Sequence, residues 1–265
     1  MKCKICTSET IFFDQATVLQ KYRVVYYRCS CCGFVQTEAP YWFKEAYSEA
    51  INESDVGLVN RNFMLSKITK AIILAFFDSA GNFIDYGGGY GLFVRLMRDH
   101  GFDFHWRDEY CPNLFAKGLE CDPAPGTTYE LLTAFEVFEH LVNPLDDIAK
   151  MLGLSRSIFF STELLPATTP RPSSWWYYGL EHGQHVSFYT RQSLSIIAKK
   201  FDLNFYTNGR SWHLLTERTI SQPIFNIISR YKIASFLHLF LHKKPLTGQD
   251  YENAVNKTRL TGGRS

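Results

Sequence analysis

Two pairs of cysteines near the start of the chain have the spacing of a metal site. Cys3 and Cys6 are separated by two residues, as are Cys29 and Cys32, and 22 residues lie between the pairs. Four thiolates can surround Zn²⁺ as a tetrahedron, and a two-residue gap lets one tight turn present both sulfurs of a pair. We therefore predict a structural zinc site made of these four cysteines. A redox-active thiol pair is the alternative, and Cys31 could replace a neighbouring ligand.

A glycine-rich segment gives the second chemical signal. Residues 83–93 read FIDYGGGYGLF, so Gly87, Gly88, Gly89 and Gly91 lie between a strand-like apolar stretch and a helical pattern. Glycines at this place in a doubly wound sheet let the backbone approach a ligand closely. A dinucleotide site would favour GxGxxG, and no phosphate-binding lysine follows. The segment indicates a nucleotide-type ligand, with a simple tight turn as the alternative.

Acid–base residues gather in a long segment rich in proline and aromatic residues. Residues 161–190 read STELLPATTPRPSSWWYYGLEHGQHVSFYT and contain Glu181, His182 and His185. A histidine can take up a proton near neutral pH. A long irregular segment that leaves the C-terminal end of a sheet strand is also the expected place for a substrate lid. The alternative is a structural turn in which the histidines hydrogen-bond to the backbone.

The elements that would position these residues alternate between strand and helix. Strands are predicted at residues 83–86, 102–106, 130–134 and 157–162, and helices at residues 62–77, 92–100, 145–154 and 190–200. Residues 203–207 and 212–216 predict a closing hairpin, because only the turn-rich NGRS separates them. We therefore expect an α/β fold of the Rossmann-like, doubly wound type, with a mainly parallel sheet and an antiparallel closing hairpin.

The glycine segment resembles a family motif. Asp85 and the glycines form Asp-x-Gly-x-Gly-x-Gly, which resembles motif I of the class I S-adenosylmethionine-dependent methyltransferases. The resemblance implies that this loop cradles the amino-acid and ribose portions of the cofactor, where a carboxylate suits the cationic ammonium group. Where the family places an acidic residue for the ribose hydroxyls, this chain has Asp108, our first choice, and Glu109.

A second segment resembles the small-molecule branch of that family (types 11, 12 and 23). Residues 131–145, LLTAFEVFEHLVNPL, resemble its fourth-strand motif, which implies that Phe135 and Glu136 line the cofactor pocket and that His140 is structural. The full set of expected cofactor-binding residues is Asp85, Tyr86, Gly87, Gly88, Gly89, Gly91, Asp108, Glu109, Phe135 and Glu136.

The histidine segment, together with the cysteine module, resembles the sugar C-methyltransferases of deoxysugar biosynthesis. Those enzymes use an adjacent Glu-His pair to abstract a proton next to a ketone. The resemblance implies that His182 is the base and that Glu181 orients it or shares its proton, with His185 as the second candidate base. The expected acceptor is a small molecule such as a sugar or polysaccharide precursor, and the methylated atom stays open.

Composition limits the other classes. The formal net charge of the 265 residues is +2, which is too mild for an extensive nucleic-acid-binding surface. An RNA base methyltransferase is an alternative, since some of those also begin with a zinc module, and a non-catalytic S-adenosylmethionine-binding scaffold is another. No apolar run reaches the roughly 18 to 20 residues that cross a bilayer, and the first residues lack a signal peptide. We expect a cytoplasmic protein.

Four segments are expected along the chain. Residues 1–38 form the zinc module, 39–80 a helical segment that covers the site, 81–218 the cofactor-binding domain and 219–265 a tail with an amphipathic helix at 224–241 and a disordered end. The tail could support a homodimer. The covering segment offers side chains that could close over cofactor or acceptor, namely Tyr47, Asp55, Arg61 and Asn62.

Overall fold

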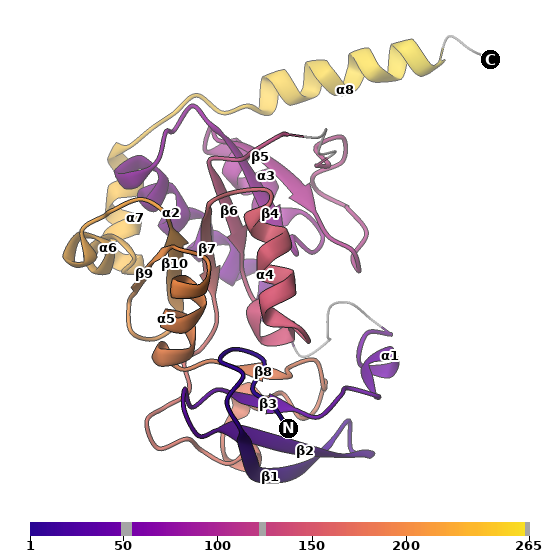
Figure 1. Ribbon diagram of the computed structural model, residues 1–265. Coiled ribbons are helices and arrows are strands. Elements are labelled where there is room, and N and C mark those ends of the chain that lie inside the picture. Colours follow the sequence, from indigo (N-terminus) through magenta and orange to yellow (C-terminus); the bar gives the residue numbers. More distant parts are fainter. Residues whose placement is uncertain (49–54, 122–125, 263–265) are drawn as a thin grey trace.

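The computed structural model describes residues 1–48, 55–121 and 126–262, and its larger sheet has the predicted architecture (Figure 1). Its strand order is β5-β4-β6-β7-β10-β9. The strands are β4 (Asn82–Tyr86), β5 (Asp103–Arg107), β6 (Leu131–Ala134), β7 (Ser157–Ser161), β9 (Asn204–Thr207) and β10 (Trp212–Thr216). The first four are parallel, while β10 runs antiparallel to both β7 and β9. The expected Rossmann-like sheet with a closing hairpin is confirmed.

Helices cover both faces of this sheet. Neighbouring strand residues point to opposite faces, so apolar side chains on both faces are buried under helices. Phe83 of β4 packs with α2 (Leu58–Phe76) and α3 (Leu92–Asp99), whereas Ile84 packs with α4 (Pro144–Leu152) and α5 (Arg191–Lys200). Both side chains are fully buried. Strands buried on two faces explain why β6 and β7 read as continuous apolar stretches.

A second, smaller sheet was not predicted. Its order is β1-β2-β3-β8, and all its pairs are antiparallel. The strands are β1 (Thr10–Val18), β2 (Tyr22–Cys29), β3 (Val35–Thr37) and β8 (Ser187–Phe188). The hairpin of β1 and β2 occupies the stretch between the cysteine pairs. β8 comes from a distant part of the chain, so residues near 187 belong to the same sheet as the N-terminal module.

Short elements connect the two sheets and the site. They are α1 (Phe43–Ala46) and the 3-10 helices η1 (Phe138–His140), η2 (Pro172–Ser174) and η3 (Trp176–Tyr178). Residues 43–46, 138–140, 172–174 and 176–178 therefore fold as short helical turns.

The tail is more helical than expected. The predicted helix at 224–241 is two helices, α6 (Gln222–Ile228) and α7 (Tyr231–Phe240), and a further helix, α8 (Thr247–Gly262), follows them. The disordered end expected for the last residues falls mostly on 263–265, outside the described residues. Asp250 of α8 pairs with Arg95 at 2.9 Å and Arg98 at 2.7 Å, which fixes the start of the helix, while the remainder extends away from the body (Figure 1). Among the described residues, no helix has the length and apolar character that crossing a membrane requires.

Candidate active site

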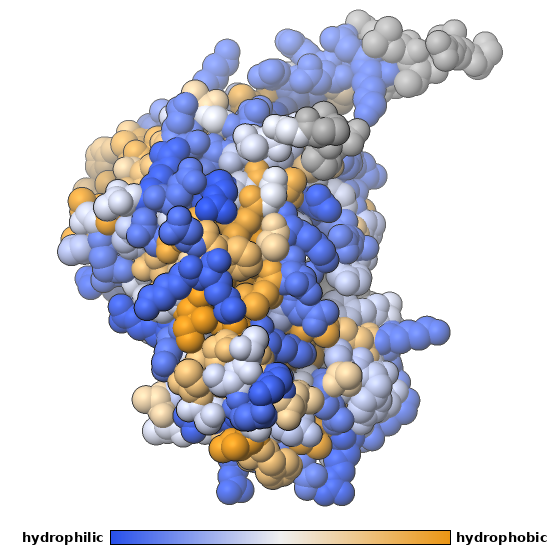
Figure 2. All heavy atoms as spheres, viewed as in Figure 1, coloured by the Kyte–Doolittle hydropathy of each residue, from blue (hydrophilic) through white to orange (hydrophobic). Residues whose placement is uncertain are grey.

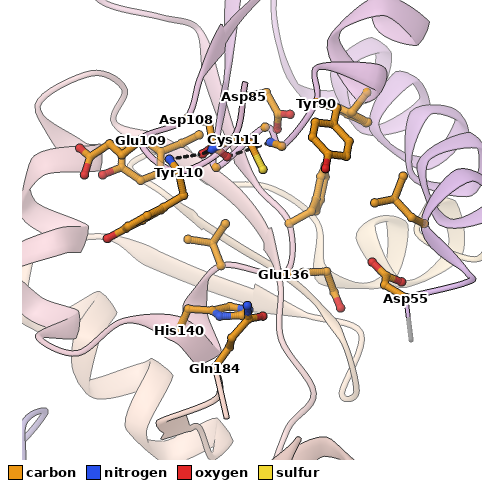
Figure 3. Close-up of a pocket in the computed structure, with 18 of the residues that line it drawn as sticks. Asp55, Asp85, Tyr90, Asp108, Glu109, Tyr110, Cys111, Glu136, His140 and Gln184 are labelled. Atoms are coloured by element: carbon orange, nitrogen blue, oxygen red, sulfur yellow. Dashed lines mark hydrogen bonds between the residues drawn. The ribbon is translucent and has the colours of Figure 1, made fainter. Parts of the chain in front are cut away.

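A cavity of about 650 Å³ opens at the C-terminal ends of β4, β5 and β6. This is the edge where doubly wound sheets bind ligands. Figure 3 shows Asp85, Asp108 and Cys111 at one end of the cavity and Glu136, His140 and Gln184 at the other. The predicted residues that line it are Asp85, Tyr86, Gly87, Gly88, Gly89, Asp108, Glu109, Phe135, Glu136, Glu181, His182 and His185. The sheet thus brings together every predicted cofactor-binding and catalytic residue except Gly91.

The glycine turn has no room for side chains. Gly87 has φ +71°, and a Cβ on it would lie 2.6 Å from Cγ2 of Val137. A Cβ on Gly88 would lie 2.9 Å from Oδ2 of Asp85. Gly91 does not line the cavity. It is the N-cap of α3 and has a left-handed backbone conformation, with φ +84°. The turn therefore presents bare backbone to the cavity, and Gly91 serves the helix start.

Asp108 organises the loops around this end of the cavity. Its Oδ2 accepts the N–H of Gly89 at 2.9 Å, and its Oδ1 accepts the N–H groups of Tyr110 at 2.7 Å and Cys111 at 2.8 Å. A carboxylate has about four acceptor positions, so Asp108 retains one for a ligand. Glu109 beside it is exposed. The two acidic residues therefore differ: Asp108 is part of the framework and Glu109 points to an open rim.

Asp85 is a buried carboxyl at the end of β4. Only 3% of it is exposed, and its Oδ1 accepts the hydroxyl of Thr133 at 2.6 Å. Burial raises the pKa of Asp85 to about 7, with a further contribution from the charge of Asp108, although the Thr133 bond opposes the shift. The group is therefore poised to ionise when a cation approaches.

Glu136 lies two residues after the end of β6, and its backbone has a constrained conformation. Its φ is +54°, a left-handed value that costs about 1–3 kcal/mol for a residue other than glycine. Its N–H donates to Oγ of Ser161 at 2.7 Å, and that hydroxyl donates back to Oε1 of Glu136 at 2.5 Å. These bonds hold the carboxylate at the cavity wall, and burial raises its pKa.

The segment expected to cover the site, residues 39–80, contributes an ion pair near Glu136. Arg61 donates to both carboxylate oxygens of Asp55, at 2.9 and 2.6 Å, and the charge of Arg61 acts on Glu136. Tyr47 and Asn62 also line the cavity, and the amide of Asn62 donates to Leu58 O of its own helix at 2.8 Å. All four residues expected to close over the site therefore lie at the cavity.

The two histidines of the loop differ in their hydrogen bonds. Nδ1 of His182 accepts the N–H of Gln184 at 3.1 Å, whereas Nδ1 of His185 donates to the carbonyl of Tyr177 at 2.6 Å. Burial lowers the pKa of His182, and the charge of Glu181 partly opposes this shift. Burial lowers the pKa of His185 well below its usual value, helped by the neighbouring histidines. His185 is therefore a neutral ring with a free Nε2 lone pair.

Two features of this region were missed at the sequence level. His140 was expected to be structural only, yet it lines the cavity, with its Nδ1 2.9 Å from the hydroxyl of Tyr47 and its ring centroid 4.9 Å from that of His185. Glu139 beside it is fully buried. The adjacent Glu-His pair in FEVFEH was the signal that could have drawn attention to both.

The segment that follows the N-terminal module holds the histidine loop from outside. Trp42 Nε1 donates to Gly183 O at 2.8 Å, and Gln184 Nε2 donates to Ala46 O at 2.8 Å. Val186 N–H donates to Glu139 O at 2.9 Å on the other side. The loop is therefore fixed between the small sheet and the segment after β6.

Four cysteines of this module form one cluster. The sulfurs of Cys3 and Cys32 are 3.6 Å apart and those of Cys6 and Cys29 are 3.3 Å apart, and all four lie within 4.8 Å of one another. Cys31 is exposed and lies outside the cluster. The structure therefore groups the predicted four thiols without Cys31.

A glycine turn at the end of the first strand of a Rossmann-like sheet defines a nucleotide-type binding fold. Residues 60–208, more than half of the chain, match the family model described as "Methyltransferase domain". The chain belongs to this family of methyltransferases. Among curated proteins, none matches it.

Solved structures similar to this chain have low sequence identity. Human N-acetylserotonin methyltransferase in complex with S-adenosylmethionine is 16% identical with a TM-score of 0.40, and the match covers 59% of this chain and 52% of that one. Magnesium protoporphyrin IX methyltransferase from Synechocystis PCC 6803 with bound S-adenosylhomocysteine is 13% identical with a TM-score of 0.42, covering 66% and 92%. An O-methyltransferase family protein from Burkholderia thailandensis is 10% identical with a TM-score of 0.47, covering 69% and 65%.

Proposed function

We propose that the protein is an S-adenosylmethionine-dependent methyltransferase that methylates a small-molecule acceptor, such as a sugar or polysaccharide precursor. The observation that carries this proposal is the single cavity that joins the glycine turn and the acidic strand ends to the histidine loop. Its volume of about 650 Å³ is in the range of sites for cofactors and small molecules. Methyl transfer from labelled cofactor to candidate sugar acceptors tests the proposal directly.

The residues present suit this cofactor. The bare backbone of Gly87 to Gly89 would admit its amino-acid portion, Asp85 would suit the ammonium group, and Asp108 with Glu109 would accept the ribose hydroxyls. Phe135 supplies a flat apolar wall. When bound, the cofactor supplies an electrophilic methyl group on a sulfonium sulfur. The residues of the protein align the acceptor, exclude water and take up its proton.

We assign proton uptake to Nδ1 of His182, which must first release the N–H of Gln184, with Glu181 beside it. A base works best when its pKa is close to the working pH, and the negative charge of Glu181 raises the pKa of His182 against the effect of burial. The pKa of His185 is lowered more strongly than that of His182, so His185 is the poorer base. No direct hydrogen bond joins Glu181 to His182 in the described part of the chain, so Glu181 acts through its charge.

We expect His182→Asn to lower kcat by about 100-fold or more, which is the usual contribution of a general base. Binding of S-adenosylhomocysteine, measured by calorimetry, should stay within about twofold because His182 lies at the acceptor end. His185→Asn is the matched comparison. A loss of turnover confined to His185→Asn would show that His182 is not the base.

The buried carboxyl of Asp85 makes cofactor binding depend on pH. Its folded pKa of about 7 lies above the ordinary value of 3.8, so the free energy of unfolding falls as pH rises from about 4 to 7. A cationic ligand binds best to the ionised carboxylate. We expect S-adenosylhomocysteine to bind about tenfold more tightly at pH 8 than at pH 6. Calorimetry across this range on Asp85→Asn should give a flat profile, and a slope that persists in this variant would contradict the assignment.

We also propose that the four-cysteine cluster binds structural zinc. Four sulfurs at about 2.3 Å from one ion are about 3.8 Å apart in a tetrahedron, close to the 3.6 and 3.3 Å separations found here. The N–H groups of Cys31 and Cys32 both point to Sγ of Cys29 at 3.4 Å, which stabilises a thiolate. A reducing compartment suits these thiols, so we place the protein in the cytoplasm.

A homodimer through the tail is the last part of the proposal. Phe236, Leu239 and Phe240 of α7 are 60, 65 and 67% exposed, and hydrophobic residues gather at this edge of the molecule (Figure 2). We expect light scattering to show a dimer that Phe236→Asp converts to monomers. Phe12→Asp, at an equally exposed position of β1, should leave the dimer intact. A monomeric natural protein would rule this contact out.

A further inference from the structure

A buried carboxylate without a partner lies beside two histidines of the cavity wall. Glu139 is fully buried, and neither of its carboxylate oxygens has a hydrogen-bond partner among the described residues. The hydroxyls of Thr162 and Tyr177 lie near Glu139 but hydrogen-bond to each other at 3.1 Å. A carboxyl group buried in this position is either protonated or compensated by a cation.

The two histidines lie close enough to Glu139 to share a cation with it. One ring nitrogen of His140, one of His185 and one carboxylate oxygen of Glu139 lie within 4.8 Å of one another. Three atoms held about 2.0–2.2 Å from one cation are at most about 4.4 Å apart, so only small movements are needed to bind an ion. The bond from Nδ1 of His185 to the Tyr177 carbonyl fixes the tautomer that leaves Nε2 free, as in metal-bound histidines.

We propose that Glu139, His140 and His185 bind a first-row divalent cation such as Mn²⁺ at the acceptor end of the cavity. Two imidazoles and a carboxylate suit such ions and leave coordination positions open. Burial and the carboxylate of Glu136 raise the pKa of Glu139, and a cation there would offset both effects.

The coordination positions that these three ligands leave open on the ion indicate which class of acceptor would bind. His140 and His185 line the cavity, so the ion would face it. An acceptor with two adjacent oxygens, such as a vicinal diol or a hydroxyketone, would complete the coordination, and the ion would lower the pKa of a bound hydroxyl. This last step rests on the proposed methyltransferase function, whereas the ion site itself does not.

The test measures the ion without cofactor or acceptor. Protein containing zinc is titrated with Mn²⁺, and free Mn²⁺ is followed by electron paramagnetic resonance. We expect one Mn²⁺ per chain, at least about tenfold weaker binding in Glu139→Gln and His185→Asn because one of three ligands is lost, and unchanged binding in Asp147→Asn. Asp147 is a matched carboxylate that lines the cavity outside the group.

Constant zinc content in all variants keeps the cysteine cluster separate from this readout, because thiolates select softer ions than Mn²⁺. Circular dichroism checks folding, and His185→Asn decides if Glu139→Gln does not fold. Absence of saturable Mn²⁺ binding, or equal affinity in the natural protein and both ligand variants, would overturn the site. Mn²⁺ binding without methyl transfer to any acceptor would overturn the proposed function and leave the site standing.

Discussion

Asp108→Asn should bind S-adenosylhomocysteine at least about 100-fold more weakly than the natural protein. The substitution removes the proposed charged acceptor for a ribose hydroxyl and weakens the bonds that hold Gly89 and residues 110–111. Hydrogen bonds to charged groups contribute about 1.5–3 kcal/mol each, so the loss of two already reaches this magnitude. Isothermal titration calorimetry gives the dissociation constants.

Glu109→Gln is the matched control for this prediction. Glu109 lies next to Asp108 and lines the same cavity, but it is exposed and makes none of these framework bonds. We expect its affinity to change by less than about tenfold, because a hydrogen bond at an exposed rim contributes about 1 kcal/mol. The opposite ranking of the two variants would assign the ribose to Glu109.

The second large effect that we expect is a loss of stability when the proposed zinc is removed. Structural zinc sites contribute about 10–16 kcal/mol of apparent binding free energy, which is comparable to the whole stability of a typical domain. Cys29→Ser should therefore lose the metal and lower the midpoint of thermal unfolding by at least about 10 °C, given about 2–4 °C per kcal/mol for chains of this size. Metal analysis and scanning calorimetry measure both effects.

Cys31→Ser provides the control, because Cys31 is exposed and lies outside the cluster. Its metal content should remain the same and its stability should change by no more than about 0.5 kcal/mol, as for most surface substitutions. A Cys29→Ser protein that keeps one zinc per chain, or a natural protein that folds fully without metal, would refute the structural role.

The main sheet was predictable because local signals agree with long-range packing. Residues 83–86, 157–162 and the hairpin around NGRS each combine apolar content with clear turn signals, and the structure has strands at all of them. The acidic strand ends followed from the same regularity, since parallel strands bring their C-terminal ends to one edge. Consequently the sequence predicted most of the residues that line this end of the cavity.

The rest depends on contacts between distant residues. β8 has only two residues, Ser187 and Phe188, and becomes a strand only because β3 pairs with it. The lack of a hydrogen-bond partner at Glu139 could not be read from the sequence, because it depends on how residues 162 and 177 pack around it. The helix α8 was missed because its polar sequence shows little amphipathic pattern, whereas the ion pairs of Asp250 fix its start.

The position of β8 has a consequence for dissecting this chain. The match to the methyltransferase family begins at residue 60, yet β3, which lies well before that residue, is the partner of β8, and Trp42 binds the loop just before it. A truncated protein that begins at residue 60 would retain the glycine turn but leave the histidine loop held only by the segment after β6. The boundaries of sequence similarity are therefore not the boundaries of the smallest fragment able to turn over substrate.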